Sequence, residues 1–323
     1  MQLSIENDMT GISTSPAVSD TSAATQAKLI GIVTVLFNSD DVLPGFFESL
    51  SRQQGVRYRL YVIDNSITDS GSVLSKSLAE QYGINAQVHF NNANVGVAKG
   101  NNQGIDMALA DGCDQVLLAN NDTEFGSDTL KILQTAAEEG HEHAVTPKIM
   151  YFDEPHRIWY GGGHINAWTM RSPHYGIDQV DTGQCNTSGH VGYAPTCFML
   201  LDSQVFEKVG RMDEQYFVYY DDTDFVWRMN IRGIRVLYLP SAVVLHKVSS
   251  STGGANSPFT VYYTNRNRVY FIRKNLSGLQ KVVALTYFFL TRLPQFGRMP
   301  RKVANRGWRG MLDGFKMTRP SAR

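Results

Sequence analysis

Four short segments of this 323-residue chain combine acidic and amide side chains in a pattern that could do chemistry. Each segment places polar residues just after an apolar, strand-like run or at the start of a helix-like one. Open α/β sheets bind ligands beyond the carboxyl ends of their strands, which is where such residues would lie. The pattern therefore predicts one site for a nucleotide, a divalent cation and a general base. The segments are Tyr61–Ser66, Asn94–Asn102, Leu117–Asp122 and Tyr219–Asp224.

The acidic residues of these segments have two candidate roles. Asp122 follows a strand-like run, and one carboxylate together with substrate phosphates can hold Mg²⁺ or Mn²⁺. The alternative for Asp122 is an N-cap of a helix that starts near Gly126. Asp221, Asp222 and Asp224 crowd into four positions, and neighbouring carboxylates raise each other's pKa toward values that suit a general base. The alternative for this cluster is a solvated helix N-terminus with a favourable dipole.

Three further features complete the candidate site. His246 follows an apolar run downstream of the acidic cluster, and an imidazole ligand would favour Mn²⁺ over Mg²⁺; the alternative is an ordinary structural histidine. Asp64 ends another strand-like run, where a carboxylate can accept hydrogen bonds from a base or a ribose. The glycine-rich stretch from Asn94 to Gly104 carries Lys99 and precedes a helix-like stretch, as a diphosphate-facing loop would. The glycine fingerprints of NAD and ATP sites do not follow the first strand-like run, so those phosphates are not expected there.

Strand-like and helix-like stretches alternate through the first 120 residues, which favours a parallel sheet with right-handed crossovers. Strands are expected at residues 29–36, 59–63, 86–90 and 115–119, and helices at 42–53, 72–82 and 98–110. Beyond residue 147 we expect a strand within 191–201, a helix at 221–231, a strand at 235–239 that Pro240 stops, and two helices between 259 and 296. The predicted fold class is α/β, with a nucleotide-binding mixed sheet flanked by helices and a helical C-terminal extension.

The predicted domain plan has three parts: a flexible leader over 1–27, a catalytic domain over 28–258 and a basic, helical region over 259–323. The catalytic domain divides into a nucleotide-binding half (28–125) and an acceptor half (126–258). The net charge of zero hides a split, because residues 1–259 hold 16 Lys and Arg against 29 Asp and Glu, whereas residues 260–323 hold 14 against one. Three cysteines without paired spacing, and no visible secretory signal, indicate a reducing, cytoplasmic location.

Together these motifs resemble the family 2 glycosyltransferases of GT-A fold, in the branch of bacterial rhamnosyl- and galactofuranosyltransferases. The similarity runs from Leu29 to about Lys274. It rests on Phe37-Asn38, Val62–Asn65, Asn94 to Gly104, Leu118–Asp122, Phe217–Arg228, Pro240 to His246, and Arg266–Arg268. The resemblance implies an inverting transfer from a UDP- or dTDP-sugar of rhamnose or galactofuranose type. The acceptor would be a hydroxyl of a glycan or lipid-linked molecule in bacterial surface polysaccharide synthesis.

The resemblance also implies roles for particular residues. Asp222 would be the catalytic base, and Asp122 and His246 would hold a divalent cation, Mn²⁺ or Mg²⁺. The donor-binding residues would be Phe37, Asn38, Asp64, Asn94, Gly96, Lys99, Asn120 and Asn121. The acceptor-side residues would be Trp159, Gly162, Gly163, Thr196 and Asp221. The chain departs from the family pattern twice: Asn120 stands where the metal motif has its first acid, and Thr196 stands where relatives usually carry glycine.

The C-terminal region combines basic and aromatic side chains. Its apolar run, Leu279 to Phe296, is too short and interrupted for a membrane span. Trp308, Phe315 and the surrounding lysines and arginines favour helices lying on an anionic leaflet at the inner face of the membrane. The alternatives are a dimerisation helix, which would make a homo-oligomer, or a solvated tail. Nucleic acid is not an expected partner.

Two other functions compete with the glycosyltransferase hypothesis. A sugar nucleotidyltransferase would need a glycine-rich, basic loop after the first strand, and this chain has Phe37–Asp41 there. A non-catalytic nucleotide or carbohydrate binder, or a membrane scaffold, would release no nucleoside diphosphate from a donor sugar, which distinguishes it from an enzyme.

Overall fold

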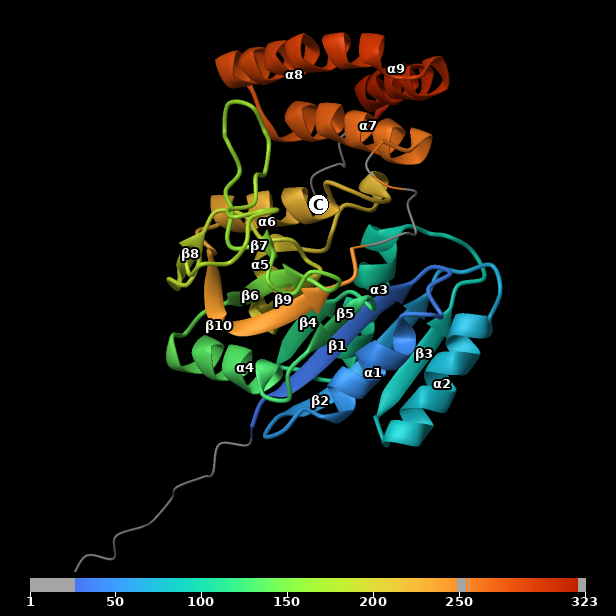
Figure 1. Cartoon of the computed structure of the whole chain (residues 1–323), viewed down its shortest axis with the longest axis vertical. Helices are drawn as coiled ribbons and strands as arrows, with labels where there is room; N and C mark the ends of the chain where they lie inside the picture. Colours follow the sequence, from blue (N-terminus) through green and yellow to red (C-terminus); the bar gives the residue numbers. More distant parts are fainter. Residues whose placement is uncertain (1–26, 249–253, 255, 319–323) are drawn as a thin grey trace, which may run out of the picture.

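Four apolar runs of the first 120 residues form the parallel half of one ten-stranded sheet (Figure 1). They lie side by side in the order β3-β2-β1-β4 with parallel registers. Their bounds are Leu29–Leu36 for β1, Arg57–Asp64 for β2, Ala86–Phe90 for β3 and Gln115–Ala119 for β4. All four predicted strands are confirmed. The strands can be apolar along their length because a parallel sheet with helices on its faces buries both sides of each strand.

Three helices connect these strands, as predicted. They are α1 (Leu43–Ser51), α2 (Ser70–Tyr82) and α3 (Val97–Ala110). Helix α1 shows why the spacing works: Leu43, Phe46, Phe47 and Leu50 fall on one helical face and are all fully buried. Helices α1 and α2 pack against each other, whereas α3 packs on β1 and β2.

The second half of the chain extends the same sheet with antiparallel and parallel pairs, so the sheet is mixed. The order continues from β4 as β9-β6-β10-β5, with β7 beside β6 and β8 beside β10. These strands are β5 (Thr123–Phe125), β6 (Ala144–Tyr151), β7 (Ile158–Tyr160), β8 (Gly189–Val191), β9 (Phe198–Asp202) and β10 (Val236–His246). The helices between them are α4 (Thr129–Glu139), α5 (Ser203–Val209), the 3₁₀ turn η1 (Glu214–Tyr216) and α6 (Asp221–Ile231).

Three local expectations were wrong. The strand expected to stop at Pro240 continues to His246, because a register shift between Leu239 and Val243 takes the proline out of the ladder with β6. The strand expected within 191–201 is two strands, β8 and β9, separated by residues 192–197. Asp122 precedes a short strand, β5, and α4 begins only at Thr129, so the helix N-cap alternative for Asp122 is excluded.

Three helices at the end of the chain stack above α6 at one end of the molecule (Figure 1). They are α7 (Pro258–Asn275), α8 (Gly278–Arg298) and α9 (Arg301–Lys316), and the first two confirm the two helices predicted between 259 and 296. Helix α9 lies almost against the backbone of α7, because a side chain at Gly310 would collide with the carbonyl oxygen of Tyr262. A second hydrophobic core, separate from that of the sheet, joins α7 and α8 to Met170 and Tyr216.

The computed structural model describes residues 27–248, 254 and 256–318. The predicted leader, apart from residue 27, and the basic residues Arg319 and Arg323 lie outside this range. Among the described helices, none is long and apolar enough to cross a membrane.

Candidate active site

The two predicted cation ligands meet at the edge of the sheet where β5 pairs with β10. Thr123 and His246 are opposite each other in this antiparallel register, and the backbone N–H of Lys247 donates to the carbonyl oxygen of Asp122 (2.9 Å). This places Oδ1 of Asp122 3.1 Å from Nε2 of His246. The ring of Trp159 packs edge-on against the imidazole of His246, with centroids 4.7 Å apart.

The atoms of this pair fit a shared divalent cation. Nε2 of His246 is the imidazole atom that faces Oδ1 of Asp122, and this Oδ1 is buried without a hydrogen-bond partner among the described residues, although buried polar atoms are normally paired. Within the described part of the chain, no group of three or more His, Cys, Asp or Glu side chains could hold a metal ion. Two protein ligands are therefore what this site offers, as expected for a cation whose other ligands are substrate phosphates and water.

The predicted nucleotide-binding residues lie around the carboxyl ends of β1, β2 and β4. Asp64 is fully buried; its oxygens accept from the backbone N–H of Ser66 (2.9 Å) and the hydroxyl of Ser72 (2.7 Å). The hydroxyl of Ser66 in turn accepts from the backbone N–H of Asn38 (2.9 Å). Asp64 thus orders the loop beside Asn38 and Phe37, and this internal role was not anticipated. The structure brings these three residues together.

The other donor-side residues lie on two neighbouring loops. Asn120 is exposed and its backbone N–H donates to the carbonyl oxygen of Cys197 (2.8 Å), whereas Asn121 is buried and donates to the hydroxyl of Ser39. Asn94 and Lys99 are exposed at the start of α3. No direct contact joins Lys99 to the cation ligands.

Gly96 has a conformational reason to be glycine. Its φ is 90°, a region that side chains disfavour, and a Cβ there would lie 2.6 Å from the ring of Phe217. The next residue, Val97, donates its backbone N–H to the carbonyl oxygen of Phe217 (2.6 Å). The glycine-rich loop is therefore packed against the loop that precedes α6 and its acidic residues.

Asp222, the predicted base, lies in the first turn of α6 and is partly exposed. Its Oδ2 accepts from the hydroxyl of Tyr193 (2.7 Å), and its Oδ1 accepts from the backbone N–H of Thr223 (2.6 Å). Burial raises the pKa of Tyr193 well above its ordinary value, so the phenol stays protonated as a donor. Asp222 is therefore fixed in orientation by groups that accept no proton from it.

Three aromatic side chains, those of Tyr193, His174 and Trp159, connect Asp222 to the predicted cation ligand His246. The ring of Tyr193 stacks on His174, with centroids 5.7 Å apart, and His174 packs edge-on against Trp159. Nδ1 of His174 lies 3.0 Å from the carbonyl oxygen of Trp159, and burial lowers the pKa of His174, which keeps the ring neutral. Asp222 and the predicted ligand His246 are thus joined by one continuous row of packed rings.

Asp221 differs from Asp222 in its environment. Only 5% of its surface is exposed, and burial, followed by the charge of Asp222, raises the pKa of Asp221 to about 8. The raised pKa expected of the acidic cluster thus falls on the buried neighbour of the predicted base. At neutral pH Asp221 is predominantly a neutral carboxylic acid.

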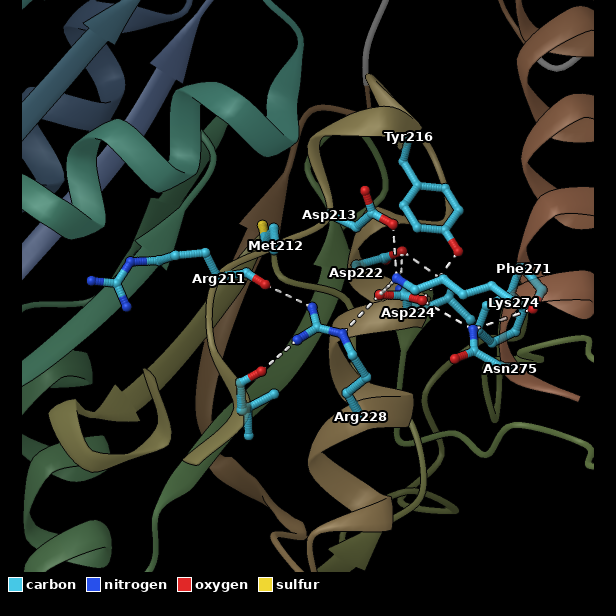
Figure 2. A network of polar contacts seen from close by, with 12 residues as sticks. Arg211, Met212, Asp213, Tyr216, Asp222, Asp224, Arg228, Phe271, Lys274 and Asn275 are labelled. Carbon is cyan, nitrogen blue, oxygen red and sulfur yellow. Dashed lines mark hydrogen bonds and ion pairs between the residues drawn. The ribbon is translucent and has the colours of Figure 1, made fainter. Parts of the chain in front are cut away.

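Asp224, the third acid of the cluster, is a structural residue (Figure 2). It is fully buried, and its Oδ2 pairs with Nε of Arg228 (2.9 Å) and Nζ of Lys274 (2.8 Å). Its Oδ1 accepts from Asn275 (3.0 Å) and from the hydroxyl of Tyr216 (3.1 Å). Although burial alone raises the pKa of a carboxyl group, the two cations and the hydrogen bonds outweigh it and lower the pKa of Asp224.

The loop before α6 is strained and is held from α7. Phe217, Tyr219 and Tyr220 have φ angles of 66°, 64° and 66°, a region that non-glycine residues rarely adopt. The side-chain amide of Asn267 donates to three carbonyl oxygens of residues 216, 218 and 219, at 2.9, 2.7 and 2.8 Å. Arg266 donates to the carbonyl oxygens of residues 215 and 216. Two residues of the Arg266–Arg268 motif thus position the loop that carries the acidic cluster.

The predicted acceptor-side residues are brought close to Asp222 through Tyr193. Gly163 is buried, and a Cβ there would come within 3.2 Å of the Tyr193 ring; Gly162 has a φ of 106° and packs beneath Tyr175. Thr196 is buried in the segment that joins Tyr193 to β9. Trp159 contacts His246, the predicted cation ligand, and its acceptor-side role stays a prediction.

The sequence reasoning missed several residues of this arrangement. Tyr193 and His174 lie in the irregular region between β7 and β9, where no periodic signal marks them. The roles of Asn267 and Lys274 depend on contacts with residues some fifty positions earlier. The only available signal was the motif at 266–268.

Comparison with known proteins gives a family and several relatives. The family model "Glycosyl transferase family 2" matches residues 31–210, more than half of the chain. A low-salt glycan biosynthesis hexosyltransferase of Haloferax volcanii is 23% identical over 273 residues, covering 82% of this chain and 81% of that protein. A dTDP-rhamnosyl transferase of Shigella flexneri is 27% identical over 189 residues, covering 56% and 61%. The N-acetylglucosaminyl-diphospho-decaprenol L-rhamnosyltransferase of Mycobacterium tuberculosis is 27% identical over 250 residues, covering 70% and 78%.

Solved structures share the fold at low identity. A mannosyltransferase from Pyrobaculum calidifontis, in complex with GDP-Man and Mn²⁺, has a TM-score of 0.54 and 13% identity and covers 91% of this chain and 77% of its own. TarS of S. aureus, in complex with UDP-GlcNAc, has a TM-score of 0.58 and 14% identity, covering 90% and 81%. These likenesses confirm the predicted GT-A fold.

The buried ion pairs of Asp224 predict a large stability effect. Asp224→Asn should lower the free energy of unfolding by about 3–5 kcal/mol, because it leaves Arg228 without a buried counter-charge and Lys274 with only Asp213. Urea unfolding at pH 7 measures this. Asp106→Asn is the matched control, since its ion pair with Arg211 is exposed and should contribute about 1 kcal/mol or less.

The ion pairs of Asp224 also predict a pH dependence. Since the pKa of Asp224 is lowered in the folded state, its contribution to the free energy of unfolding is present above the unfolded pKa of about 3.9 and is lost as the pH falls further. Equal effects of the two substitutions at pH 7 would contradict the structural role of Asp224.

Proposed function

Since this chain belongs to glycosyl transferase family 2, we propose that it is an inverting enzyme that uses a UDP- or dTDP-sugar of rhamnose or galactofuranose type. The acceptor is a hydroxyl of a glycan or lipid-linked molecule in bacterial surface polysaccharide synthesis. The observation that carries the proposal is the row of packed rings that holds Asp222 beside the Asp122–His246 pair. The names of two relatives, a dTDP-rhamnosyl transferase and a diphospho-decaprenol rhamnosyltransferase, support the donor and acceptor classes.

Asp222 acts as the general base in this proposal. Its carboxylate takes the proton of the acceptor hydroxyl while that oxygen bonds to the anomeric carbon, and the bond from this carbon to the diphosphate breaks with its electrons passing to the leaving group. One displacement inverts the anomeric centre. Tyr193 and Thr223 hold the carboxylate in place through the hydrogen bonds described above, so its orientation is set before substrate binds.

Asp122 and His246 would hold a divalent cation at the donor diphosphate. A cation there neutralises charge that develops on the leaving group. The buried and unpaired Oδ1 of Asp122, which faces Nε2 of His246, supports this role, and the Mn²⁺ bound to the mannosyltransferase of similar fold supports a divalent cation in general. Phe37, Asn38 and the loop ordered by Asp64 would contact the pyrimidine base. Asn94, Gly96, Lys99, Asn120 and Asn121 complete the donor side, and Gly162, Gly163, Thr196 and Asp221 the acceptor side.

Helix α9 is the proposed contact with an anionic membrane surface at the inner leaflet. Trp308, Leu312 and Phe315 are spaced at helical intervals and are 42%, 56% and 37% exposed. They share the helix surface with exposed Arg306 and Lys316. Apolar side chains flanked by basic ones suit insertion at the headgroup level of an anionic leaflet.

The catalytic unit proposed at 28–258 needs α7 as well, because Asn267 and Lys274 hold its acidic loop and helix.

Loss of the base should abolish transfer without weakening donor binding. Asp222→Asn keeps the shape of the side chain but cannot take a proton, so turnover should fall by about 10²–10⁴-fold or more, with nucleotide affinity unchanged. Release of nucleoside diphosphate from a donor sugar, with and without acceptor, measures turnover and calorimetry measures affinity. Parallel loss of both quantities would mean that Asp222 is structural. A wild-type protein that binds nucleotide and releases none would favour a non-catalytic binder.

Loss of the cation ligand should affect nucleotide binding only when metal is present. Asp122→Ala should weaken UDP or dTDP binding in Mn²⁺ by at least about tenfold, since even residues that only support metal ligands change affinity by about 10–100-fold. In EDTA the variant and wild type should bind alike. Asp128→Ala, an exposed acid at the start of α4, is the control. The same affinity for wild type and Asp122→Ala in Mn²⁺ would refute this assignment.

The membrane contact predicts selective binding to anionic vesicles. Wild type should sediment with phosphatidylglycerol vesicles and much less with phosphatidylcholine vesicles, and the double variant Trp308→Ser, Leu312→Ser should lose most of this binding. Ile231→Ser changes an apolar side chain on α6 that is 64% exposed and should have no effect. Unaltered sedimentation of the double variant would leave a dimerisation surface or a solvated tail as the role of α9.

A further inference from the structure

We propose that Arg171, Arg268 and Arg292 form a binding site for a diphosphate group carried by the acceptor, beside the loop that leads to Asp222. This inference rests on the proposed function, because it assigns a chemical class to the acceptor of that reaction. The three residues come from three separate parts of the chain: the segment between β7 and β8, helix α7 and helix α8.

Arg268 is the buried centre of the cluster. Only 3% of its surface is exposed. One terminal nitrogen donates to the carbonyl oxygen of Thr169 (2.8 Å), whereas its Nε is buried without a hydrogen-bond partner among the described residues. Burying a guanidinium group is costly unless an anion or acceptors compensate for the lost water. The unpaired Nε is therefore a donor without its acceptor.

The other two arginines are placed beside Arg268 by its own contacts. Arg171 follows the hydrogen-bonded Thr169 by two residues and is exposed. The guanidinium of Arg268 lies over the ring of Phe288, 5.4 Å from its centroid, and Arg292 is one helical turn beyond Phe288 on α8. Burial, followed by the charge of Arg268, lowers the pKa of Arg292, and the charge of Arg171 adds to this.

No acidic side chain of the described chain neutralises this cluster. None of the three arginines has a carboxylate within 4.0 Å in the described part of the structure, whereas Arg211, Arg228 and Lys274 are each paired with an acid. Arg292 donates a hydrogen bond to a neutral partner, the side-chain oxygen of Gln295 (2.8 Å). Three facing cations without a counter-charge indicate that the counter-charge comes from a ligand.

The cluster also lies at the correct place for an acceptor. The side chain of Tyr220, the residue directly before Asp221, packs against the hydrophobic cluster that contains Met170 and Phe288. Met170 directly precedes Arg171, and Phe288 contacts Arg268. Burial raises the pKa of Tyr220, and the charges of the three arginines oppose this effect. None of the three arginines belongs to the strand ends that carry the candidate donor residues. An acceptor with its hydroxyl at Asp222 and its anionic group at the arginines would therefore lie along the loop 217–220.

The chemistry of guanidinium groups favours phosphate esters. Planar guanidinium forks bind phosphate oxygens in pairs, and three of them match the charge of a diphosphate better than that of a single carboxylate. The same chemistry could bind a phospholipid headgroup, so the test must separate the two sources.

The test is calorimetric titration with inorganic diphosphate in EDTA, so that a metal at Asp122 and His246 cannot contribute. Wild type should bind diphosphate. Arg171→Gln and Arg292→Gln should each weaken binding by at least about tenfold, because a hydrogen bond to a charged group contributes about 1.5–3 kcal/mol. Both side chains retain solvent contact, so both variants should fold, which thermal unfolding checks. Arg298→Gln removes the same charge from an exposed position further along α8 and should bind diphosphate like wild type.

Two results would overturn the proposal: wild type does not bind diphosphate, or all variants bind it equally. In the first case vesicle binding identifies the ligand, because loss of binding to phosphatidylglycerol vesicles by the two cluster variants would assign the cluster to lipid headgroups. Binding of UDP or dTDP in Mn²⁺ is measured on the same samples. Normal nucleotide binding with failed diphosphate binding would reject only the arginine site, whereas absent nucleotide binding would reject the proposed function.

Discussion

The buried charge of Asp224 is the interaction on which the site depends most. A carboxylate without solvent contact needs compensating charge, and here Arg228 supplies it from the same helix and Lys274 from α7. Because Lys274 also pairs with Asp213, one ammonium group joins α6, α7 and the segment before η1 (Figure 2). The first turn of α6, which includes Asp222, is therefore anchored by Arg228 of the same helix and by Lys274 of α7.

The same helix supports a strained backbone. Each residue in the left-handed region costs of order 1–3 kcal/mol, and three of them lie within residues 217–220. Asn267 and Arg266 satisfy the carbonyl oxygens that this conformation exposes, and the glycine-rich loop packs on the other side at Phe217. The strained loop thus contacts two elements far apart in sequence, α7 and the glycine-rich loop. These contacts fix the orientation of the acidic residues at the start of α6.

How far the sequence predicted this structure can be judged from particular residues. Strand β1 and helix α6 could be placed because their patterns are local: a continuous apolar run and a helical repeat after a polar start. The family resemblance paired Asp122 with His246, and the pairing of β5 with β10 brings their side chains to 3.1 Å. The continuation of β10 past Pro240 could not be predicted, because a bulge depends on the neighbouring strand. The sequence does not distinguish the three acids of α6, because they are the same residue type. Their burial and partners make Asp221 a neutral acid, Asp222 a candidate base and Asp224 a structural ion. Tyr193 was missed because its contact with Asp222 depends on tertiary packing.

The support of the acidic loop by α7 has a consequence for the order of events during synthesis. Chains emerge from the ribosome N-terminus first, and folding of the early part begins before the rest is made. The strands of the sheet and the acidic residues of α6 leave the ribosome before Asn267 and Lys274 do. A nascent chain at that stage has the elements of a nucleotide-binding sheet, but its strained loop lacks the amide that holds it and Asp224 lacks one of its two cations. The ordered acidic turn is therefore a property of the finished chain, and a transcript truncated before α7 would yield a protein without it.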